Sequence, residues 1–547
     1  MFKISPMLSL FLITLVLRSC HARSDVGGYQ QFLDEHAPLS PPQPLAARGL
    51  LANVFGSSMV FQMGAPLVLW GFVAPGATVH VSFGPNLTGT GVGDASGLWR
   101  ASLPALAGPS GPYTVTAWVE GSPGSNATLT DVHVGTVLLC SGQSNTSGAT
   151  TPTAFCFNAT ATEAEAADFP QLRLFAAGEQ AVNGWLPPLQ QLGFSPHIPW
   201  SLANASAARF SCMCYMAAKV MARQLGPGHA LGVIEAAWSG TCIQGWLPGA
   251  ALASCGANPP PSQGGRGNST LFNQLVAPFT AGGAGGFTVA GFLWGQGESN
   301  AIYFREGYYA CGLGALLSSW RGAFNSPAGW FGVMQLAPWS GFSTSALAAS
   351  TVREEQAAVV FGDPHATLAA EIDLGDPASP LSDIHNRPKQ ALGARLAAGA
   401  LLHLFAQGAA GDSQGPAYAR AVSGGGPAGS LSATVFFAPA AFAAPGSLLL
   451  ANRSSWPGVV PAGQCPAASG YDCAGFEIQD AAGAWHAAAA SLNGDASAVV
   501  LTAAGAAAGG RANATRYGQG VWPLASLFAA QGAALPAYPW AARAVAG

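Results

Sequence analysis

The stretch VHVGTVLLC at residues 132–140, followed by SGQSN at 141–145, decides the fold class of this chain. A short, mostly apolar run that ends in a glycine turn is typical of a strand buried on both faces of a sheet. Two later stretches repeat the arrangement: ALGVIEAAW (230–238) precedes SGT, and FTVAGFLW (287–294) precedes GQGESN. We therefore expect three buried strands that each end in a small polar loop.

Further strands and helices alternate with these runs. GWFGVMQLA (329–337) and ATLAAEI (366–372) have the mostly apolar pattern of two more buried strands. Residues 210–225, 308–324 and 389–405 carry apolar residues at helical spacing. Strands that alternate with helices indicate a mainly parallel sheet covered by helices. We predict an α/β domain of this kind over residues 132–408.

The segments on either side of this domain have different residue patterns. Residues 23–47 are rich in proline and read as a linker. From 48 to 131, short runs such as TVHVSFG and YTVTAWV alternate with Pro/Gly turns, which predicts an N-terminal β-sandwich domain. Runs such as SATVFFA and SAVVLT predict a C-terminal β-rich domain over 409–547. With 8% charged residues, a net charge of −4 and no basic run, the chain has no electrostatic footprint for nucleic acid.

The N-terminus has the features of a signal peptide. Lys3 precedes an apolar run at 7–17, and Cys20-His21-Ala22 offers small residues for cleavage, so we predict a signal peptide over 1–22. The apolar run is short for a membrane span. We expect a secreted protein in an extracellular or lumenal compartment (a lysosome or vacuole included), with no stable membrane insertion after cleavage.

Nine cysteines remain once Cys20 is removed, and an odd number cannot all pair within one chain. Cys242 with Cys255 and Cys465 with Cys473 are close enough to close short loops, but spacing leaves the pairing open. Neither a CxxC nor an HExxH zinc pattern occurs, so we expect no metal.

The polar loops carry the candidate chemistry. Carboxyl ends of parallel strands gather the reacting groups of open α/β sheets, and glycines there let backbone N–H groups approach a ligand. Ser144 lies on such a turn, and a serine hydroxyl needs a base within hydrogen-bond reach. His385, which Asp383 precedes by two residues, is the candidate base. The GxSxG elbow of common α/β-hydrolases is absent from the sequence.

Five motifs resemble the sialate O-acetylesterase family of the SGNH hydrolase superfamily: CSGQSN (140–145), WSGTCIQGW (238–246), LFNQLVAP (271–278), LWGQGESNA (293–301) and DIHNRPKQALGARLA (383–397). LANVFGSSMVFQ (51–62) and VLWGFVAPG (68–76) resemble the family's N-terminal β-domain, and GFEIQDAAGAWHAA (475–488) its C-terminal one. The resemblance implies an SGNH-hydrolase three-layer sandwich flanked by N- and C-terminal β-rich domains.

The same resemblance implies roles for individual residues. Ser144 would be the nucleophile and His385 the general base. The oxyanion would be held by the backbone amides of Ser144 and Gly240, with the Gln296 side chain as a third donor. Asn145 would brace the turn, and Glu298 would orient Gln296 or the substrate. The sequence departs from the family at four positions that lie in or next to these motifs: Thr146, Ser239, Gln244 and Asn386.

The third member of the triad is open. SGNH enzymes place this acid three residues before the histidine, where the chain has Ser382, so the candidate is Asp383. The carboxylate would accept the Nδ1–H of His385, and its loss would then cost about 10³–10⁴-fold in kcat. The alternatives for the same proton are a backbone carbonyl, Asp373 or Asp376.

The implied reaction is hydrolysis of an O-acetyl ester on a sugar or glycan through an acetyl-serine, which needs no cofactor. A histidine base with an ordinary pKa predicts a kcat/KM that rises near about pH 6.5. Two alternatives are open: an esterase of acetylated xylan or pectin, and a non-catalytic carbohydrate-binding protein, which the departures at Thr146, Ser239 and Gln244 would favour.

Overall fold

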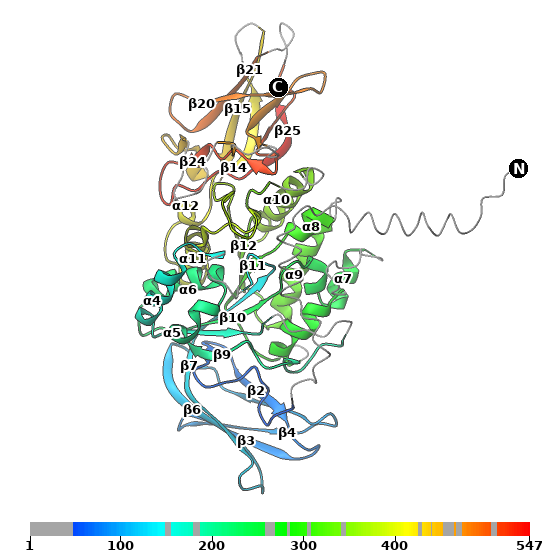
Figure 1. The fold of residues 1–547 in the computed structure, drawn as a ribbon, viewed down its shortest axis with the longest axis vertical. Coiled ribbons are helices and arrows are strands. Elements are labelled where there is room, and N and C mark those ends of the chain that lie inside the picture. Colours follow the sequence, from blue (N-terminus) through cyan, green and yellow to red (C-terminus); the bar gives the residue numbers. More distant parts are fainter. Residues whose placement is uncertain are drawn as a thin grey trace, which may run out of the picture.

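The computed structural model of the protein describes residues 47–147, 155–178, 186–256, 268–281, 285–303, 308–340, 346–424, 429–438, 440–451, 464–466, 473–504 and 511–546. The signal peptide predicted over 1–22 and nearly all of the linker predicted over 23–47 lie outside these residues. Three units follow one another along the longest axis of the molecule (Figure 1). Within the described residues, no helix has the length and apolar character needed to cross a membrane.

The N-terminal unit consists of strands that pack around a shared apolar core. One set pairs β3 with β4 and β6, and β6 with β7, while β2 pairs with β5. The side chains of Phe61, Trp70 and Phe83 are buried between them. The strands are β1 (Val60–Gln62), β2 (Leu67–Phe72), β3 (Thr78–Phe83), β4 (Leu87–Val92), β5 (Leu98–Leu103), β6 (Ser110–Val119) and β7 (Asn126–Gly142).

Strand β7 belongs to two units at once. Its first half pairs with β6 and β1, and its second half pairs with β10 and β11 of the central sheet. The predicted division between residues 131 and 132 therefore falls inside one continuous strand. The strand carries the chain straight from the N-terminal unit to the SGQSN turn.

The central sheet has the strand order β13-β12-β11-β7-β10-β8-β9. All its neighbouring pairs are parallel except β8 with β9, which confirms the mainly parallel sheet. Its strands beyond β7 are β8 (Leu172–Ala176), β9 (Ile198–Leu202), β10 (Leu231–Ala237), β11 (Gly291–Gly295), β12 (Trp330–Met334) and β13 (Ala366–Ala369).

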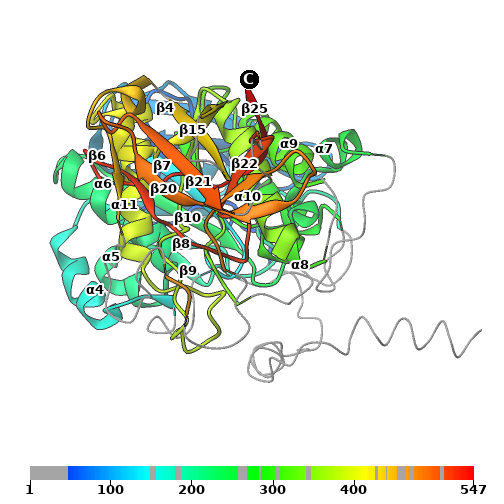
Figure 2. The same cartoon turned by 90° about the horizontal axis from the view of Figure 1, so that it is seen from above.

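Helices cover both faces of this sheet, which confirms the three layers. Helices α6 and α11 lie side by side on one face, and α9 and α10 lie on the other (Figures 1 and 2). Leu138 and Cys140 belong to the core under α6 and α11, whereas Val137 and Leu139 belong to the opposite core. The helices are α4 (Ala159–Glu165), α5 (Ala203–Ser206), α6 (Cys212–Leu225), α7 (Gly249–Ser254), α8 (Glu298–Tyr303), α9 (Tyr308–Ala323), α10 (Ala346–Phe361), α11 (Lys389–Phe405) and α12 (Ala410–Ser413).

The C-terminal unit is built on a sheet with the order β19-β18-β22-β25-β14-β15-β21-β20, which confirms a β-rich C-terminus. Arg353 of α10 ties it to the central unit by donating to the Gly520 and Val521 carbonyls. The strands are β14 (Ala417–Ser423), β15 (Ser430–Ala438), β16 (Leu448–Leu450), β17 (Cys473–Ala474), β18 (Phe476–Gln479), β19 (Trp485–Ala487), β20 (Ala489–Leu492), β21 (Ala498–Ala504), β22 (Ala514–Tyr517), β23 (Trp522–Pro523), β24 (Leu527–Ala529) and β25 (Trp540–Ala546).

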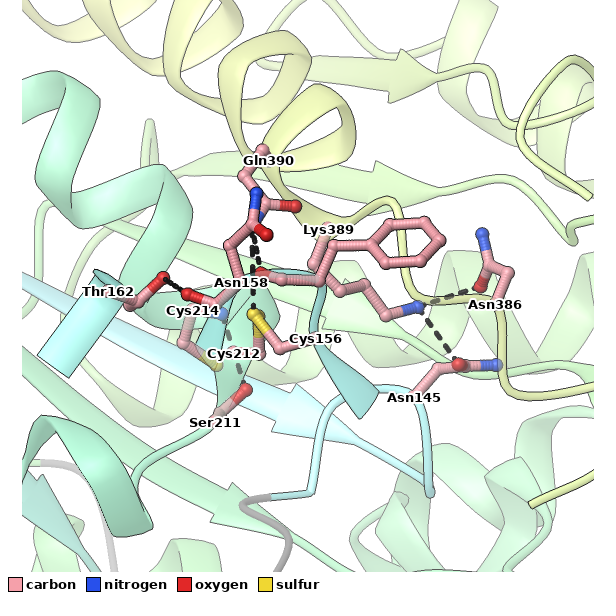
Figure 3. The surroundings of a disulfide bond; sticks show 11 residues. Asn145, Cys156, Asn158, Thr162, Ser211, Cys212, Cys214, Asn386, Lys389 and Gln390 are labelled. Atoms are coloured by element: carbon pink, nitrogen blue, oxygen red, sulfur yellow. Dashed lines mark hydrogen bonds between the residues drawn. A yellow bond between two sulfur atoms is a disulfide. The ribbon is translucent and has the colours of Figure 1, made fainter. Parts of the chain in front are cut away.

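Four disulfides join described residues. Two anchor the start of α6, and Figure 3 shows the surroundings of the one between Cys156 and Cys212. Cys255 bonds to Cys311 rather than to Cys242, which is buried outside the four bonds. The disulfides are Cys140–Cys214, Cys156–Cys212, Cys255–Cys311 and Cys465–Cys473.

Candidate active site

Three central strands end level with one another. Gly142 at the end of β7 is the register partner of Ala237 in β10 and of Gly295 in β11. The chain leaves β7 toward β8 on one side, whereas β11 pairs on the other side, so the connections diverge at the end of β7. Ligands of open α/β sheets bind at such switch points. The loops after β7, β10 and β11 therefore form one site.

A sharp turn positions Ser144 at the centre of this site. Gly142 has a φ of 146°, and a Cβ atom there would collide with the carbonyl oxygen of Gly295. Only glycine fits both demands. The carbonyl of Gln143 then accepts hydrogen bonds of 2.8 Å from the N–H groups of Thr146 and Ser147, which closes a helical turn around Ser144.

Two backbone amides of the site, one in the serine turn and one in the loop after β10, are available to a ligand. Among the described residues, the N–H groups of Ser144 and Gly240 find no acceptor. Gly240 has a φ of 67°, a conformation that side chains disfavour. Amides held this way can donate to the negative oxygen of a tetrahedral intermediate.

The side chain of Gln296 is placed differently from the predicted oxyanion donor. Its Nε2 lies 3.1 Å from Gln143 Oε1, 3.0 Å from the Thr241 carbonyl and 2.7 Å from Asn300 Oδ1. Two amide hydrogens thus already face three acceptors, and no hydrogen is left for an oxyanion. The structure corrects the prediction: Gln296 braces the three loops against one another.

Asn145 and Glu298 form a buried pair behind the serine turn. Asn145 Nδ2 donates to Glu298 Oε1 at 2.7 Å and to the carbonyl of Ile384 at 2.9 Å. The second bond joins the residue after Ser144 to the residue before His385. Glu298 thus binds Asn145 and not Gln296, while a role toward the substrate stays a prediction.

Asn145 should carry no glycan, although Asn145-Thr146-Ser147 is a glycosylation sequon. Its side chain is buried, and both hydrogens of Nδ2, the atom that would bear the sugar, are donated within the site. Mass spectrometry of active enzyme should find this peptide unmodified. A glycan there on active protein would contradict the placement of the site.

His385 lies in a turn that fixes its tautomer. Ser382 adopts a φ of 80°, and the His385 N–H donates to the Ser382 carbonyl at 3.0 Å. This turn brings the carbonyl of Leu381 to 2.7 Å from His385 Nδ1. A carbonyl oxygen only accepts, so Nδ1 carries the proton in the neutral ring. Nε2 is then the nitrogen that can act as a base.

Asp383, the predicted triad acid, binds a different partner. Its carboxylate accepts hydrogen bonds from the backbone N–H and the hydroxyl of Ser340, after β12. The backbone carbonyl of Leu381 holds Nδ1 instead, which was one of the alternatives. The two other acids are paired with arginines, Asp373 with Arg395 and Asp376 with Arg387.

Burial sets the protonation of His385. Its side chain is 1% exposed, and this burial lowers the pKa to about 4, although the Leu381 carbonyl favours the charged ring and opposes the shift. The imidazole is therefore neutral and ready to accept a proton at neutral pH. This value replaces the sequence expectation of about 6.5.

Sequence reasoning missed a buried cluster behind these residues. Lys389, Glu371 and Asn386 are each fully buried and linked to Asn145 and Glu298. One signal was available: the sequence has only three lysines, and Lys389 opens an apolar helix. A lysine is rarely buried unless it is paired.

Comparisons with known proteins agree with this architecture. Residues 134–401 match the family described as "Carbohydrate esterase, sialic acid-specific acetylesterase". The chain is 30% identical over 381 residues to the sialate O-acetylesterases of Pongo abelii and Homo sapiens, covering 64% of this chain and 70% of each relative.

A solved structure extends the similarity to the flanking units. The crystal structure of a carbohydrate acetylesterase from Xanthomonas citri superposes with a TM-score of 0.70 at 26% identity, covering 90% of this chain and 99% of that chain. The motifs, the sheet and these similarities together show that the chain belongs to the sialate O-acetylesterase family of carbohydrate esterases.

Proposed function

We propose that this protein hydrolyses O-acetyl esters on a sugar, with Ser144 as nucleophile and His385 as general base. One observation carries the proposal: the Ser144 turn, which like Gly240 offers an available amide, is joined by the Asn145–Ile384 hydrogen bond to a histidine of fixed tautomer. A non-catalytic carbohydrate-binding protein would not need this combination. Release of acetate from acetylated sugars by wild type, but not by Ser144→Ala, tests it.

In the first half of the reaction, Ser144 Oγ attacks the acetyl carbonyl as His385 Nε2 takes the serine proton. The carbonyl oxygen becomes an oxyanion that the N–H groups of Ser144 and Gly240 stabilise. His385 then returns the proton to the sugar oxygen as the bond to the acetyl carbon breaks. The alcohol leaves, and Ser144 is acetylated.

In the second half, His385 Nε2 takes a proton from water, which attacks the acetyl-serine through the same oxyanion site. Collapse releases acetate and returns the proton to Ser144. Throughout, the Leu381 carbonyl accepts the Nδ1–H and stabilises the charged imidazolium by hydrogen bonding.

Asp383→Asn should reduce kcat by less than about tenfold, because the Nδ1 proton goes to a backbone carbonyl that this substitution leaves in place. The remaining loss would come from a weaker bond to Ser340, which anchors the histidine turn. Steady-state kinetics on p-nitrophenyl acetate would measure it. A loss of about 10³–10⁴-fold with the fold intact would instead restore Asp383 as the triad acid.

The pH profile should be flat across neutrality. A base with a pKa of about 4 stays neutral above pH 5, so kcat/KM should vary little from pH 5 to 8. As pH falls through the pKa, the ring is protonated and kcat/KM should drop about tenfold per pH unit. An acid limb with its midpoint near about 6.5 would show that the ring is more solvated than the structure has it.

The proposal extends to the sugar that carries the acetyl group. The similarity to two sialate O-acetylesterases favours an O-acetylated sialic acid, while the Xanthomonas citri structure is described only as a carbohydrate acetylesterase. Acetate release should be compared on acetylated sialic acid, xylan and pectin. Preference for acetylated sialic acid would support a sialate O-acetylesterase activity. Preference for acetylated xylan or pectin would instead support a polysaccharide esterase.

We also propose a secreted or lumenal location. Disulfides persist in oxidising compartments, and the described residues include four. The predicted signal peptide points the same way. Fractionation of cells that express the full chain would test it, and reduced cysteines in a cytosolic protein would contradict it.

A further inference from the structure

A single buried ammonium group lies behind the serine turn and the histidine turn. Lys389 is the first residue of α11, and its side chain is completely buried. Its Nζ donates to Asn145 Oδ1 at 2.9 Å and to Asn386 Oδ1 at 2.8 Å, as Figure 3 shows. The mechanism above makes no use of Lys389.

Both asparagines adjoin reacting residues. Asn145 follows Ser144 in the sequence, and Asn386 follows His385. A shift of either amide therefore moves the backbone that carries the nucleophile or the base. Because Asn145 and Asn386 bind the same nitrogen, Lys389 fixes the two turns relative to each other.

The remaining bonds of the asparagines make this arrangement unique. Asn145 Nδ2 donates to Glu298 Oε1, and Asn386 Nδ2 donates to the Leu374 carbonyl at 3.1 Å and toward Glu371 Oε2 at 3.5 Å. An ammonium only donates and a carboxylate only accepts, so neither amide can flip without losing partners at both ends.

Charge explains why the cluster needs a cation. Burial raises the pKa of Glu298, and raises that of Glu371 to about 7, while Lys389 opposes both shifts. Burial lowers the pKa of Lys389, and Glu371, Glu298 and Asp376 oppose that shift. Other cations face the cluster from two helices: Arg353 of α10 acts on Glu298, and Arg395 of α11 acts on Glu371.

We propose that Lys389 is a positioning residue, which holds Ser144 and His385 in reactive alignment through Asn145 and Asn386. This inference rests on the proposed function, since it assigns Lys389 to that same site. Lys389 contacts neither reacting side chain in the hydrogen bonds described, so its effect passes through the asparagines.

Lys389→Met should lower kcat on p-nitrophenyl acetate by about 10²-fold, the cost of a misplacement of about 1 Å, and change KM by less than about twofold. Lys219→Met is the matched control. Lys219 pairs with Glu165 on α4, away from the cluster, and its loss should leave both constants unchanged. Wild-type kcat in folded Lys389→Met would overturn the proposal.

The pH profile supplies a readout that a purely structural role would not move. Burial is the main cause of the low pKa of His385, and the Lys389 charge lowers it further. Removing this charge should therefore raise the pKa of His385, and the acid limb of kcat/KM should move to higher pH. An unmoved limb would contradict the proposed coupling.

A double variant separates alignment from charge balance. Lys389→Met combined with Glu371→Gln removes the cation together with one buried carboxylate, so the folded state keeps its charge balance. If Lys389 aligns the turns, the folded double variant should remain about 10²-fold slow. Recovery of wild-type kcat would overturn the proposal, as would failure of both variants to fold, since Lys389 would then serve stability alone.

Ser144→Ala, measured in parallel, distinguishes failure of this inference from failure of the proposed function. Full activity in Ser144→Ala would overturn the site itself. An inactive Ser144→Ala beside a fully active Lys389→Met would leave the site standing and remove only the positioning role.

Discussion

Ser144→Ala is expected to lower kcat/KM for acetyl ester hydrolysis by about 10⁴-fold or more, because no other group replaces the attacking hydroxyl. His385→Ala should lose a similar amount, since the hydroxyl is a poor nucleophile without its base. The double variant should be little worse than either single one, because residues that act as one unit lose activity non-additively. Initial rates on p-nitrophenyl acetate would measure all three.

His229→Ala is the matched control for the histidine. His229 is partly buried and hydrogen-bonded to Thr136, but it lies just before β10 starts, at the opposite edge of the sheet from Ser144. This variant should keep near wild-type activity. Losses at Ser144 and His385 that simply multiply would argue against a shared proton transfer, provided circular dichroism shows intact folds.

The largest expected effect on stability is at Arg353. Its buried guanidinium donates to four backbone carbonyls, those of Leu336, Ala337, Gly520 and Val521. Arg353→Met would leave these oxygens buried without a donor. Each such loss costs about 1–3 kcal/mol, and removal of the buried charge offsets part of the sum, so we expect a net loss of about 3–5 kcal/mol.

Thermal unfolding would measure this loss as a fall in Tm of about 3–4 °C, because the entropy of unfolding scales with chain length. Arg543→Met is the control, because Arg543 joins the same helix to the C-terminal unit through Glu354 but is half-exposed. A pair with one half-exposed partner keeps contact with solvent and should contribute about 1 kcal/mol or less. Equal shifts for the two variants would contradict the role given to Arg353.

The sheet was predictable from the sequence for physical reasons. Runs such as 230–238 are apolar at every position but Glu235 because both faces of the sheet are covered, and this pattern can be read without tertiary information. The roles of Ser144 and His385 stay predictions, and what the structure adds is the Asn145–Ile384 hydrogen bond that joins their two turns.

The orientation of polar side chains was not predictable. Gln296 was assigned to the oxyanion because an amide can donate, but three acceptors from other loops take its hydrogens. Asp383 lies near His385 in sequence, yet the turn at Ser382 presents a backbone carbonyl to the ring instead. The partners of Gln296 come from distant loops, and the partner of His385 depends on the backbone conformation at Ser382, so residue types alone predict neither.

The boundary between the first two units and one edge strand could not be predicted from the sequence either. The break predicted at 131/132 falls within β7, because a change from alternating to continuous apolar pattern marks a change of neighbours and not the end of a strand. The antiparallel edge strand β9 was missed, since its five residues include a proline and carry little apolar periodicity.

The account rests on Ser144 as the nucleophile, and covalent labelling tests this most directly. An organophosphonate probe, which traps activated serines, should inactivate the enzyme at one equivalent, and peptide mass spectrometry should find the label on Ser144. His385→Ala should label far more slowly, because the hydroxyl loses its base. Inactivation with the label on another residue, or full labelling of Ser144 without loss of activity, would contradict the account.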